Sequence, residues 1–599
     1  MRLLPQTTLF CRSVVSRSCL SFLLTSLLVS LPAGAKELDF GDDSELEGSF
    51  DTTLSLGTTI RAQSRDESII GRQNGGTGNS INGDNGNLNY DHGDVTSVVG
   101  SITNELDLSY DRTSLFIRTF GFWDWMVMTQ DTERTSFSPS AERFAGGDFR
   151  LLDAYVTQDF NIGDEGALTI RAGQQVINWG ESTFIPNGLI SINPVDVTRL
   201  RTAGAALQNA LIPMPAIDFN YSVDENLSFE AFYQFRFDHT DLEPEGTFFS
   251  TTDIASPGGN TVLLGFGAPG IPDNPAPYGL GVAGPVGIAV ARGSDRDAGN
   301  QGQFGLAARW FVPELNDTEF GLYWTHVHSR VPLIGAVTGS LAGLGAGDYA
   351  ASAEYFIEYP EDINTIGASF NTQVGSEGTA IQGEFIYRFD QPLQKDDVEL
   401  LFAALTPLNP VFGANQVGSF GFDETIQGYI ERDMIQGQVT VTQLTGPWAG
   451  ADQWVMLAEA GFSYFRDFPD KDELRLEGPG TYTTGNPFFT AAGIQPETET
   501  DGFADKFSWG YRLVTRADFN NAIAAWNIRP SLAFQHDKGT SPAPITNFVD
   551  DRKTITGTVA ADYLNRYQVG VSYTNFFDGG RYNLLRDRDF VSIFGSVFF

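Results

Sequence analysis

Long stretches in which apolar and polar residues alternate recur along this chain of 599 residues. Between residues 46 and 62 the even positions are mostly apolar and the odd positions mostly polar, and the same period returns at 227–237 and 379–390. Because successive side chains of a β-strand point to opposite faces, each stretch predicts a strand with one apolar and one polar face. Alternation over about ten or more residues is typical of membrane β-barrel strands.

Eighteen strands are predicted in this way. They lie near residues 46–62, 95–111, 113–128, 149–161, 167–179, 216–223, 226–238, 302–312, 318–329, 362–374, 379–390, 434–445, 452–466, 507–519, 524–536, 553–564, 567–576 and 588–599. Links after even-numbered strands are short, whereas those after odd-numbered strands are long and rich in Gly, Asn, Asp and Pro. This pattern indicates an all-β fold, a transmembrane antiparallel β-barrel of about 18 strands with short periplasmic turns and long extracellular loops.

The final predicted strand ends at the last residue, Phe599. Val591, Ile593, Val597 and Phe599 share one face of it. Taken alone, such a strand also fits a soluble β-sandwich. The sorting of short and long links favours the barrel, and we therefore expect Phe599 to be the C-terminal residue that closes it.

The amino-terminal residues 1–35 have the pattern of a secretory signal peptide. Arg2, Arg12 and Arg17 precede an apolar stretch at 20–31, and Ala33-Gly34-Ala35 has the form of a cleavage site. The apolar stretch is shorter than the roughly 20 residues of a membrane-spanning helix. We expect residues 36–599 to form a single barrel in the bacterial outer membrane.

The composition restricts the kinds of site that the mature chain can form. Both cysteines, Cys11 and Cys19, lie in the predicted signal peptide, which excludes disulfides, thiolate metal sites and a cysteine nucleophile from the mature chain. The formal net charge is −38, and removal of three arginines without any acid takes it to −41. Such a charge repels nucleic acid and favours divalent cations, including those that bridge lipopolysaccharide.

The third long link, residues 180–215, differs from the others because it has helical periodicity. Asn193 is placed to cap a helix that starts at Pro194. Its apolar face would contain Val195, Leu200, Ala203, Leu207 and Leu211. We expect this loop to fold inward and to narrow the pore.

Charged residues on the polar strand faces are candidates for the lining of the lumen. Arg512, Arg516 and Arg529 are predicted to share one wall. Glu230, Glu384, Glu105 and Asp107 would line the others. These charges could create a selectivity field, but the favoured interpretation is that opposite charges pair with one another in a solvated interior.

Metal and catalytic patterns are weak. The stretch 82–91 is dense in oxygen-bearing side chains but lacks the spacing of a calcium loop, which favours a polar turn. His326 and His328 share the face of Phe320, Leu322 and Trp324, which predicts a position at the lipid rim and no metal site. No nucleophile, base and orienting residue stand out together. We expect neither an enzyme nor a cofactor.

One motif carries a resemblance. Trp179-Gly180-Glu181, followed by Asn193-Pro194 and Asp196, resembles the family of outer-membrane proteins catalogued as domain of unknown function 1302, and the likeness extends over nearly the whole mature chain. The resemblance implies a periplasmic partner of lipoprotein-carrier type and an inner-membrane permease of the resistance-nodulation-division superfamily. It also implies that the motif segment matters, and it supplies no catalytic residues.

Three functions stay open from the sequence. The leading hypothesis is passage or export of an apolar or amphipathic compound, with 180–215 as the constriction. The alternatives are a general diffusion porin and a surface or scaffold protein without transport. Expected partners in every case are outer-membrane lipid, lipopolysaccharide and the barrel-assembly machinery, and nucleic acid is excluded.

Overall fold

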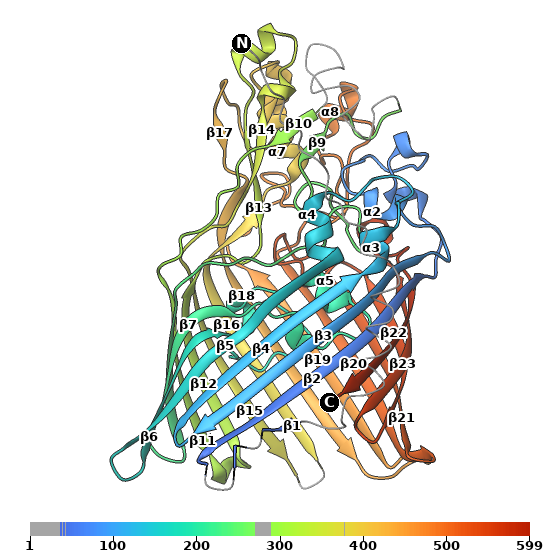
Figure 1. Ribbon diagram of the computed structural model, residues 1–599. Helices are drawn as coiled ribbons and strands as arrows, with labels where there is room; N and C mark the ends of the chain where they lie inside the picture. The colour runs from blue at the N-terminus through green and yellow to red at the C-terminus, as the bar shows by residue number, and fades with distance from the viewer. Residues whose placement is uncertain (1–35, 39, 42–43, 270–288, 376–377) are drawn as a thin grey trace, which may run out of the picture.

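The computed structural model describes residues 36–38, 40–41, 44–269, 289–375 and 378–599, so the predicted signal peptide lies outside the described residues. Eighteen strands form one closed antiparallel barrel, which confirms the predicted fold (Figure 1). They are β2 (Leu46–Arg61), β3 (Val95–Tyr110), β4 (Thr113–Asp124), β5 (Gly147–Ile162), β6 (Gly166–Gln175), β7 (Met214–Ser222), β8 (Leu227–Gln234), β11 (Gln303–Val312), β12 (Thr318–Val327), β15 (Ile363–Val374), β16 (Thr379–Gln394), β18 (Tyr429–Thr445), β19 (Gln453–Phe465), β20 (Phe507–Ile523), β21 (Trp526–Lys538), β22 (Lys553–Tyr563), β23 (Tyr567–Phe577) and β24 (Phe590–Phe598). A two-residue strand, β1 (Lys36–Glu37), pairs with β2.

The links alternate in length as predicted. Short turns such as 111–112 and 564–566 lie at one end of the barrel, together with the start of β2 and the end of β24. Long links such as 62–94 and 466–506 lie at the other end (Figure 1). None of the helices in the described ranges is long and apolar enough to cross a membrane.

The barrel closes between its first and last long strands. β2 pairs with β24 from Thr53 opposite Phe598 to Arg61 opposite Phe590. Beyond this register, the N–H of Phe599 donates to the carbonyl of Thr52 at 2.9 Å, and the N–H of Thr52 donates back at 3.1 Å. The last residue therefore continues the ladder that closes the barrel.

The two faces of the strands differ as the alternation predicts. Leu56, Phe385 and Ile593 are about half exposed and lie on the outer face. Ser55 and Ser596 face each other on the inner side, where their hydroxyls lie 2.8 Å apart. The outer surface is thus apolar and the inner surface polar, as a barrel in lipid requires.

A second sheet was not predicted from the sequence. It has five short strands, β9 (Thr261–Leu263), β10 (Ala289–Arg292), β13 (Leu333–Val337), β14 (Glu354–Glu358) and β17 (Thr425–Ile426), in the order β17-β13-β14-β10-β9. Three long links contribute to it, and it stands above the long-loop end of the barrel (Figure 1).

The helices are short and lie in the links. The α-helices are α2 (Asn85–Leu88), α3 (Trp125–Thr129), α4 (Pro139–Ala141), α5 (Val197–Arg201), α6 (Leu341–Gly345), α7 (Asp397–Ala404) and α8 (Pro487–Ala491). A π-helical turn, η3 (Glu142–Gly146), follows α4, and the 3-10 turns are η1 (Glu67–Ile69), η2 (Arg72–Asn74), η4 (Leu189–Ile192), η5 (Leu207–Asn209), η6 (Pro313–Leu315), η7 (Ala350–Ser352), η8 (Pro410–Ala414) and η9 (Gly580–Tyr582).

Three predicted strands end four residues earlier than their alternation suggested, and one of them, predicted at 226–238, stops at Gln234. The strand predicted at 113–128 stops at Asp124, whose carboxylate caps α3 by accepting the N–H of Met126 at 2.9 Å. The strand predicted at 167–179 stops at Gln175. The next residues leave the wall of the barrel and begin the segment described below.

Candidate functional site

The link between β6 and β7, residues 176–213, runs through the interior of the barrel. Its first half hydrogen-bonds to the inner faces of β16, β18 and β19, and its second half contacts β2, β3 and β24. β16 and β2 are eight strands apart in one direction around the ring and ten in the other. The inward segment, as we name residues 176–213, therefore reaches from one wall to the opposite wall.

Glu384, on the inner face of β16, holds the first half of the inward segment. Its carboxylate accepts the backbone N–H of Glu181 at 2.8 Å and that of Leu189 at 3.1 Å. A Cβ added at Gly180 or Gly188 would collide with this carboxylate, so both positions need glycine. Gly180 also has a φ of +94°, which other residues rarely adopt.

Glu459, on the inner face of β19, makes the second attachment two strands away from β16. Its carboxylate accepts the N–H groups of Thr183, Phe184 and Ile185 at 2.8 to 3.0 Å, and only 1% of the residue is exposed. Carboxylates that accept several backbone N–H groups make strong, charge-assisted hydrogen bonds. The segment is thus fixed to this wall by buried acids rather than by apolar packing alone.

The second half of the inward segment lies against the opposite wall. Gln208 donates to Glu105 at 3.1 Å, and Asn209 donates to the Thr103 hydroxyl at 3.2 Å. Gly204 lies against Phe594, where a side chain would collide with the ring. Both ends of the crossing are therefore attached.

The tryptophan of the motif packs against the inner face of the barrel wall and is almost fully buried there. Trp179 is 1% exposed and its ring packs against Phe232 and Tyr323, with ring centroids 4.9 and 5.7 Å away. Glu181 accepts from Asn371 at 3.3 Å. The start of the motif thus places the backbone that Glu384 binds.

The predicted helix beginning at Pro194 is wrong in both start and length. The helix is α5, a single turn whose N-cap is Asp196, which accepts from the N–H of Arg199 at 3.0 Å. Asn193 instead joins the two ends of a loop, since it accepts from the N–H of Ile177 at 3.0 Å and donates to its carbonyl at 2.6 Å. Asp196 is also paired with Arg150 at 3.2 Å.

Two cavities lie on either side of the inward segment. The one toward the long loops has a volume of about 390 Å³, and the one toward the short turns about 220 Å³. Within η5, Leu207 lines the first cavity and Gln208 the second. The segment therefore divides the space inside the barrel.

The larger cavity is amphipathic. Phe184, Leu200 and Leu207 line it, and these side chains are 42%, 48% and 67% exposed although they lie inside the barrel. Arg330 and Arg388 supply polar groups to its wall. The smaller cavity is mostly polar, with hydroxyl and carboxylate groups from β2, β3 and β24 and amide groups from Gln208 and Asn209 of the inward segment.

Four of the other predicted lumen charges face inward and are paired. Arg512 pairs with Asp537 at 2.7 Å, Arg516 with Asp518 at 2.9 Å, and Arg529 with Asp562 at 2.6 Å. Arg529 also lies 3.7 Å from Asp518, so Arg516 and Arg529 share one acid while Arg512 is held elsewhere. Glu230 pairs with Arg309 at 2.5 Å.

The two histidines do not share the lipid rim. His326 stacks on Phe304 of the outer face, whereas His328 lies beyond the end of β12 and is 2% exposed. The Nδ1 of His328 accepts the N–H of Asp362 at 3.0 Å, and its Nε2 lies 3.1 Å from the carbonyl of Gln301. Both ring nitrogens are therefore engaged.

The oxygen-rich stretch 82–91 joins long links. Asn82 pairs with the backbone of Leu263 through both its amide oxygen and its amide nitrogen, at 2.8 and 2.9 Å. Asn87 accepts from Arg61 at 2.8 Å, and Asn89 donates to the carbonyl of Gly246 at 2.9 Å. These amides have structural hydrogen-bond partners within the protein.

Glu459 and Arg388 both hold the inward segment, and neither was predicted from the sequence as a site residue. Arg388 donates to the carbonyl of Asn187 at 3.0 Å and to the Ser191 hydroxyl at 2.9 Å. The sequence did contain a signal for these contacts. Inward positions in the middle of β16, β18 and β19 contain long polar side chains such as Gln438, which would have water as their only partner if no segment crossed the barrel.

Comparisons with known proteins give one family. The family model described as "Protein of unknown function (DUF1302)" matches residues 16–599. No curated protein matches the chain.

Solved structures that resemble this chain share little sequence with it. OccAB1 of Acinetobacter baumannii is 10% identical with a TM-score of 0.41, over 94% of this chain and 98% of that one. OccD3 of Pseudomonas aeruginosa is 10% identical with a TM-score of 0.35, over 95% and 93%. A BenF-like porin from Pseudomonas fluorescens is 7% identical with a TM-score of 0.38, over 94% and 99%. The function of this chain has to be argued from its own geometry.

Proposed function

This chain belongs to the DUF1302 family of proteins of unknown function, and from its barrel and inward segment we propose that it is an outer-membrane channel for an apolar or amphipathic compound. The apolar outer face supports a place in lipid, and the sorted links support the outer membrane. The inward segment, including the motif from Trp179 to Asp196, forms the constriction.

One observation carries the choice of compound. Phe184, Leu200 and Leu207 expose apolar surface inside the barrel, beside the polar groups of Arg330 and Arg388. Exposed apolar surface costs about 25 cal/mol per Å² when it faces water, and a compound with its own apolar surface would cover it. A pore for small hydrophilic solutes gains nothing from such side chains at its constriction.

Partners follow from the family resemblance. The proposal includes a periplasmic carrier of lipoprotein-carrier type and a permease of the resistance-nodulation-division superfamily, which would move the compound between the two membranes. Lipopolysaccharide and the barrel-assembly machinery are proposed from the barrel itself, and residues 1–35 are proposed as the signal for secretion.

Uptake into liposomes tests the proposal. We expect the protein to pass an amphipathic dye faster than sugars of similar mass, because the dye can cover the apolar surface. Replacing Phe184, Leu200 and Leu207 with Gln should lower the rate of dye uptake on the order of tenfold. This factor corresponds to a loss of about 1.4 kcal/mol of interaction with the dye. Leu341→Gln, an exposed change in α6 on a long loop, is the matched control.

A general diffusion porin would give the opposite result in this uptake measurement. The polar cavity toward the short turns favours this second candidate. If sugars cross rapidly through the unaltered protein and the triple replacement leaves the rate for the dye unchanged, the constriction selects by size and the proposal for an apolar compound is wrong.

A further inference from the structure

Three carboxylates meet in the long links, away from the inward segment. Asp396 and Asp397 lie at the start of α7, and Glu477 belongs to the link between β19 and β20. Each offers a carboxylate oxygen, and these three oxygens all lie within 4.8 Å of one another. The link 395–428 and the link 466–506 are therefore joined at this point by acids.

The cluster is buried and short of partners. Asp396 is fully buried, and its Oδ1 has no hydrogen-bond partner among the described residues, although its side chain also caps α7 through the N–H of Glu399 at 3.2 Å. The Oδ1 of Asp397 is also buried and without a partner in the described part of the chain. Oxygens in this state lack the compensation that buried polar atoms normally have.

Basic side chains do not neutralise the cluster. No ion pair joins Asp396, Asp397 or Glu477 to a Lys, Arg or His of the described ranges. The positive charge of Arg475 acts on Asp396 and favours its ionised form, but the Arg475 guanidinium forms its ion pair with Glu399, at 3.5 Å. The Glu477 carboxylate accepts the N–H of Asp397 at 2.8 Å and the Thr481 hydroxyl at 3.3 Å.

Burial and mutual repulsion work against three negative charges. Burial raises the pKa of Asp397 to about 6. Burial, followed by the neighbouring acids, raises the pKa of Asp396 and of Glu477 well above their ordinary values. Three carboxylates that meet without a basic partner in the described ranges therefore favour a bound cation.

The spacing fits one ion. Calcium takes carboxylate oxygens at about 2.3–2.6 Å, so a single ion can reach three oxygens that lie within 4.8 Å of one another. Zinc prefers nitrogen and sulfur ligands, and magnesium demands a stricter octahedron. We propose that Asp396, Asp397 and Glu477 form a divalent-cation site, with calcium as the preferred ion, that clamps α7 to the link after β19.

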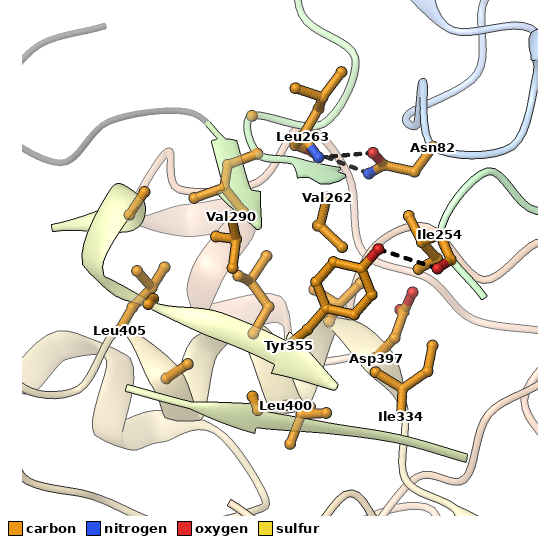
Figure 2. Close-up of a pocket in the computed structure, with 18 of the residues that line it drawn as sticks. Asn82, Ile254, Val262, Leu263, Val290, Ile334, Tyr355, Asp397, Leu400 and Leu405 are labelled. Carbon is orange, nitrogen blue, oxygen red and sulfur yellow. Dashed lines mark hydrogen bonds between the residues drawn. The ribbon is translucent and has the colours of Figure 1, made fainter. Parts of the chain in front are cut away.

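The clamp has a structural consequence for a neighbouring pocket. Asp397 lines an apolar pocket of about 120 Å³ together with Leu400 of α7 and Tyr355 of β14 (Figure 2). The hydroxyl of Tyr355 donates to the carbonyl of Ile254 at 3.0 Å. An ion at the start of α7 would thus fix one wall of this pocket.

Calorimetry on the full-length folded barrel in detergent tests the site. After chelation and dialysis, CaCl₂ alone is titrated into the protein, and MgCl₂ alone into a second sample. We expect one saturable calcium site per chain, with weaker binding of magnesium. Asp396→Asn and Glu477→Gln should each weaken calcium binding at least tenfold. Asn is as good a helix cap as Asp, so the first variant keeps α7.

Asp472→Asn, an exposed acid of the same link, is the control and should bind calcium as the unaltered protein does. Binding that is absent, or that is equal in all variants, overturns the proposal. If Glu477→Gln does not fold, a second measurement tests the site, namely the effect of calcium on the melting temperature. Calcium must raise the melting temperature of the unaltered protein and of Asp472→Asn, but not that of Asp396→Asn. Neither measurement depends on transport, so this site and the channel can fail separately.

Discussion

The carboxylate of Glu459 accepts the backbone N–H of Ile185 at 3.0 Å, although 274 residues separate them in sequence. The same carboxylate accepts the N–H groups of Thr183 and Phe184, so one buried acid of β19 binds three consecutive peptide groups of the inward segment. A strand residue therefore determines where the segment lies across the barrel.

Glu459→Ala should loosen the inward segment. The change leaves three N–H groups without their acceptor, at about 1–3 kcal/mol each where water does not replace it. We expect a lower melting temperature and larger current fluctuations in a planar bilayer. Glu105→Gln is the matched control, because Glu105 lies on the opposite wall and accepts one hydrogen bond from the segment, that of Gln208. Equal current traces for Glu459→Ala and the unaltered protein would show that this attachment is unimportant.

Gly188→Ala should displace the same segment by crowding. An added Cβ would collide with the Glu384 carboxylate, and crowding of this kind costs about 1–3 kcal/mol. Thermal unfolding followed by circular dichroism measures the loss. Gly345→Ala, at the end of α6, meets open space and should leave the melting temperature unchanged. A neutral effect at Gly188 would mean that Glu384 is free to move.

Arg61→Met should destabilise the long-loop end of the barrel. Arg61 and Asp587 are fully buried and lie 3.1 Å apart, so the change removes one of the two guanidinium partners of this carboxylate and leaves Arg588, at 3.3 Å, as the other. We expect a loss of about 1–3 kcal/mol in the free energy of unfolding, measured with denaturant, because buried acceptors lose a donor that water does not replace. Arg236→Gln removes the exposed pair with Asp238 and should cost at most about 1 kcal/mol. Similar losses for both variants would contradict this ranking.

The acid cluster makes the stability of α7 depend on pH when divalent cations are removed. The pKa of Asp397 is raised from 3.8 to about 6, so the folded protein holds a proton that the unfolded chain releases near pH 3.8. Stability from this group is therefore highest below about pH 4 and falls as pH rises to about 6. In the presence of a chelator, we expect the link 395–428 to be cut faster at pH 7 than at pH 5, when the protease used at each pH is adjusted to the same activity on an unfolded substrate.

Added calcium should remove most of that pH difference, because the ion stabilises the ionised carboxylates. Asp397→Asn should make the pH difference smaller without calcium, since Asn does not titrate whereas Asp396 and Glu477 still do. A cleavage rate that rises with pH in Asp397→Asn as in the unaltered protein would place the effect elsewhere.

The barrel was predictable because its strands are long and two-sided. In β2, an apolar residue such as Leu56 faces outward and a polar one such as Ser55 faces inward, and lipid imposes this alternation on every strand. The second sheet was not predictable in the same way. Its strands have two to five residues, are largely covered on both faces, and pair across links that are distant in sequence.

The candidate site was only partly predictable. The position of 180–215 in the chain suggested an inward loop, but its periodicity suggested a long helix where α5 is a single turn. Asn193 was the predicted helix cap, but its side chain hydrogen-bonds to the backbone of Ile177, and Asp196 caps α5 instead. The meeting of Asp397 with Glu477, 80 residues apart, follows from tertiary structure alone.

Single-channel conductance after deletion of residues 203–208 tests the central claim most directly. The deletion removes the part of the inward segment that lies against β2 and β24, including Gly204 and Leu207. A deletion of equal length at 341–346, in a long loop, is the control. We expect the first deletion to raise the conductance of the open channel and the second to leave it unchanged. Conductance that stays the same after the first deletion would contradict the account, because the segment would then not restrict the pore.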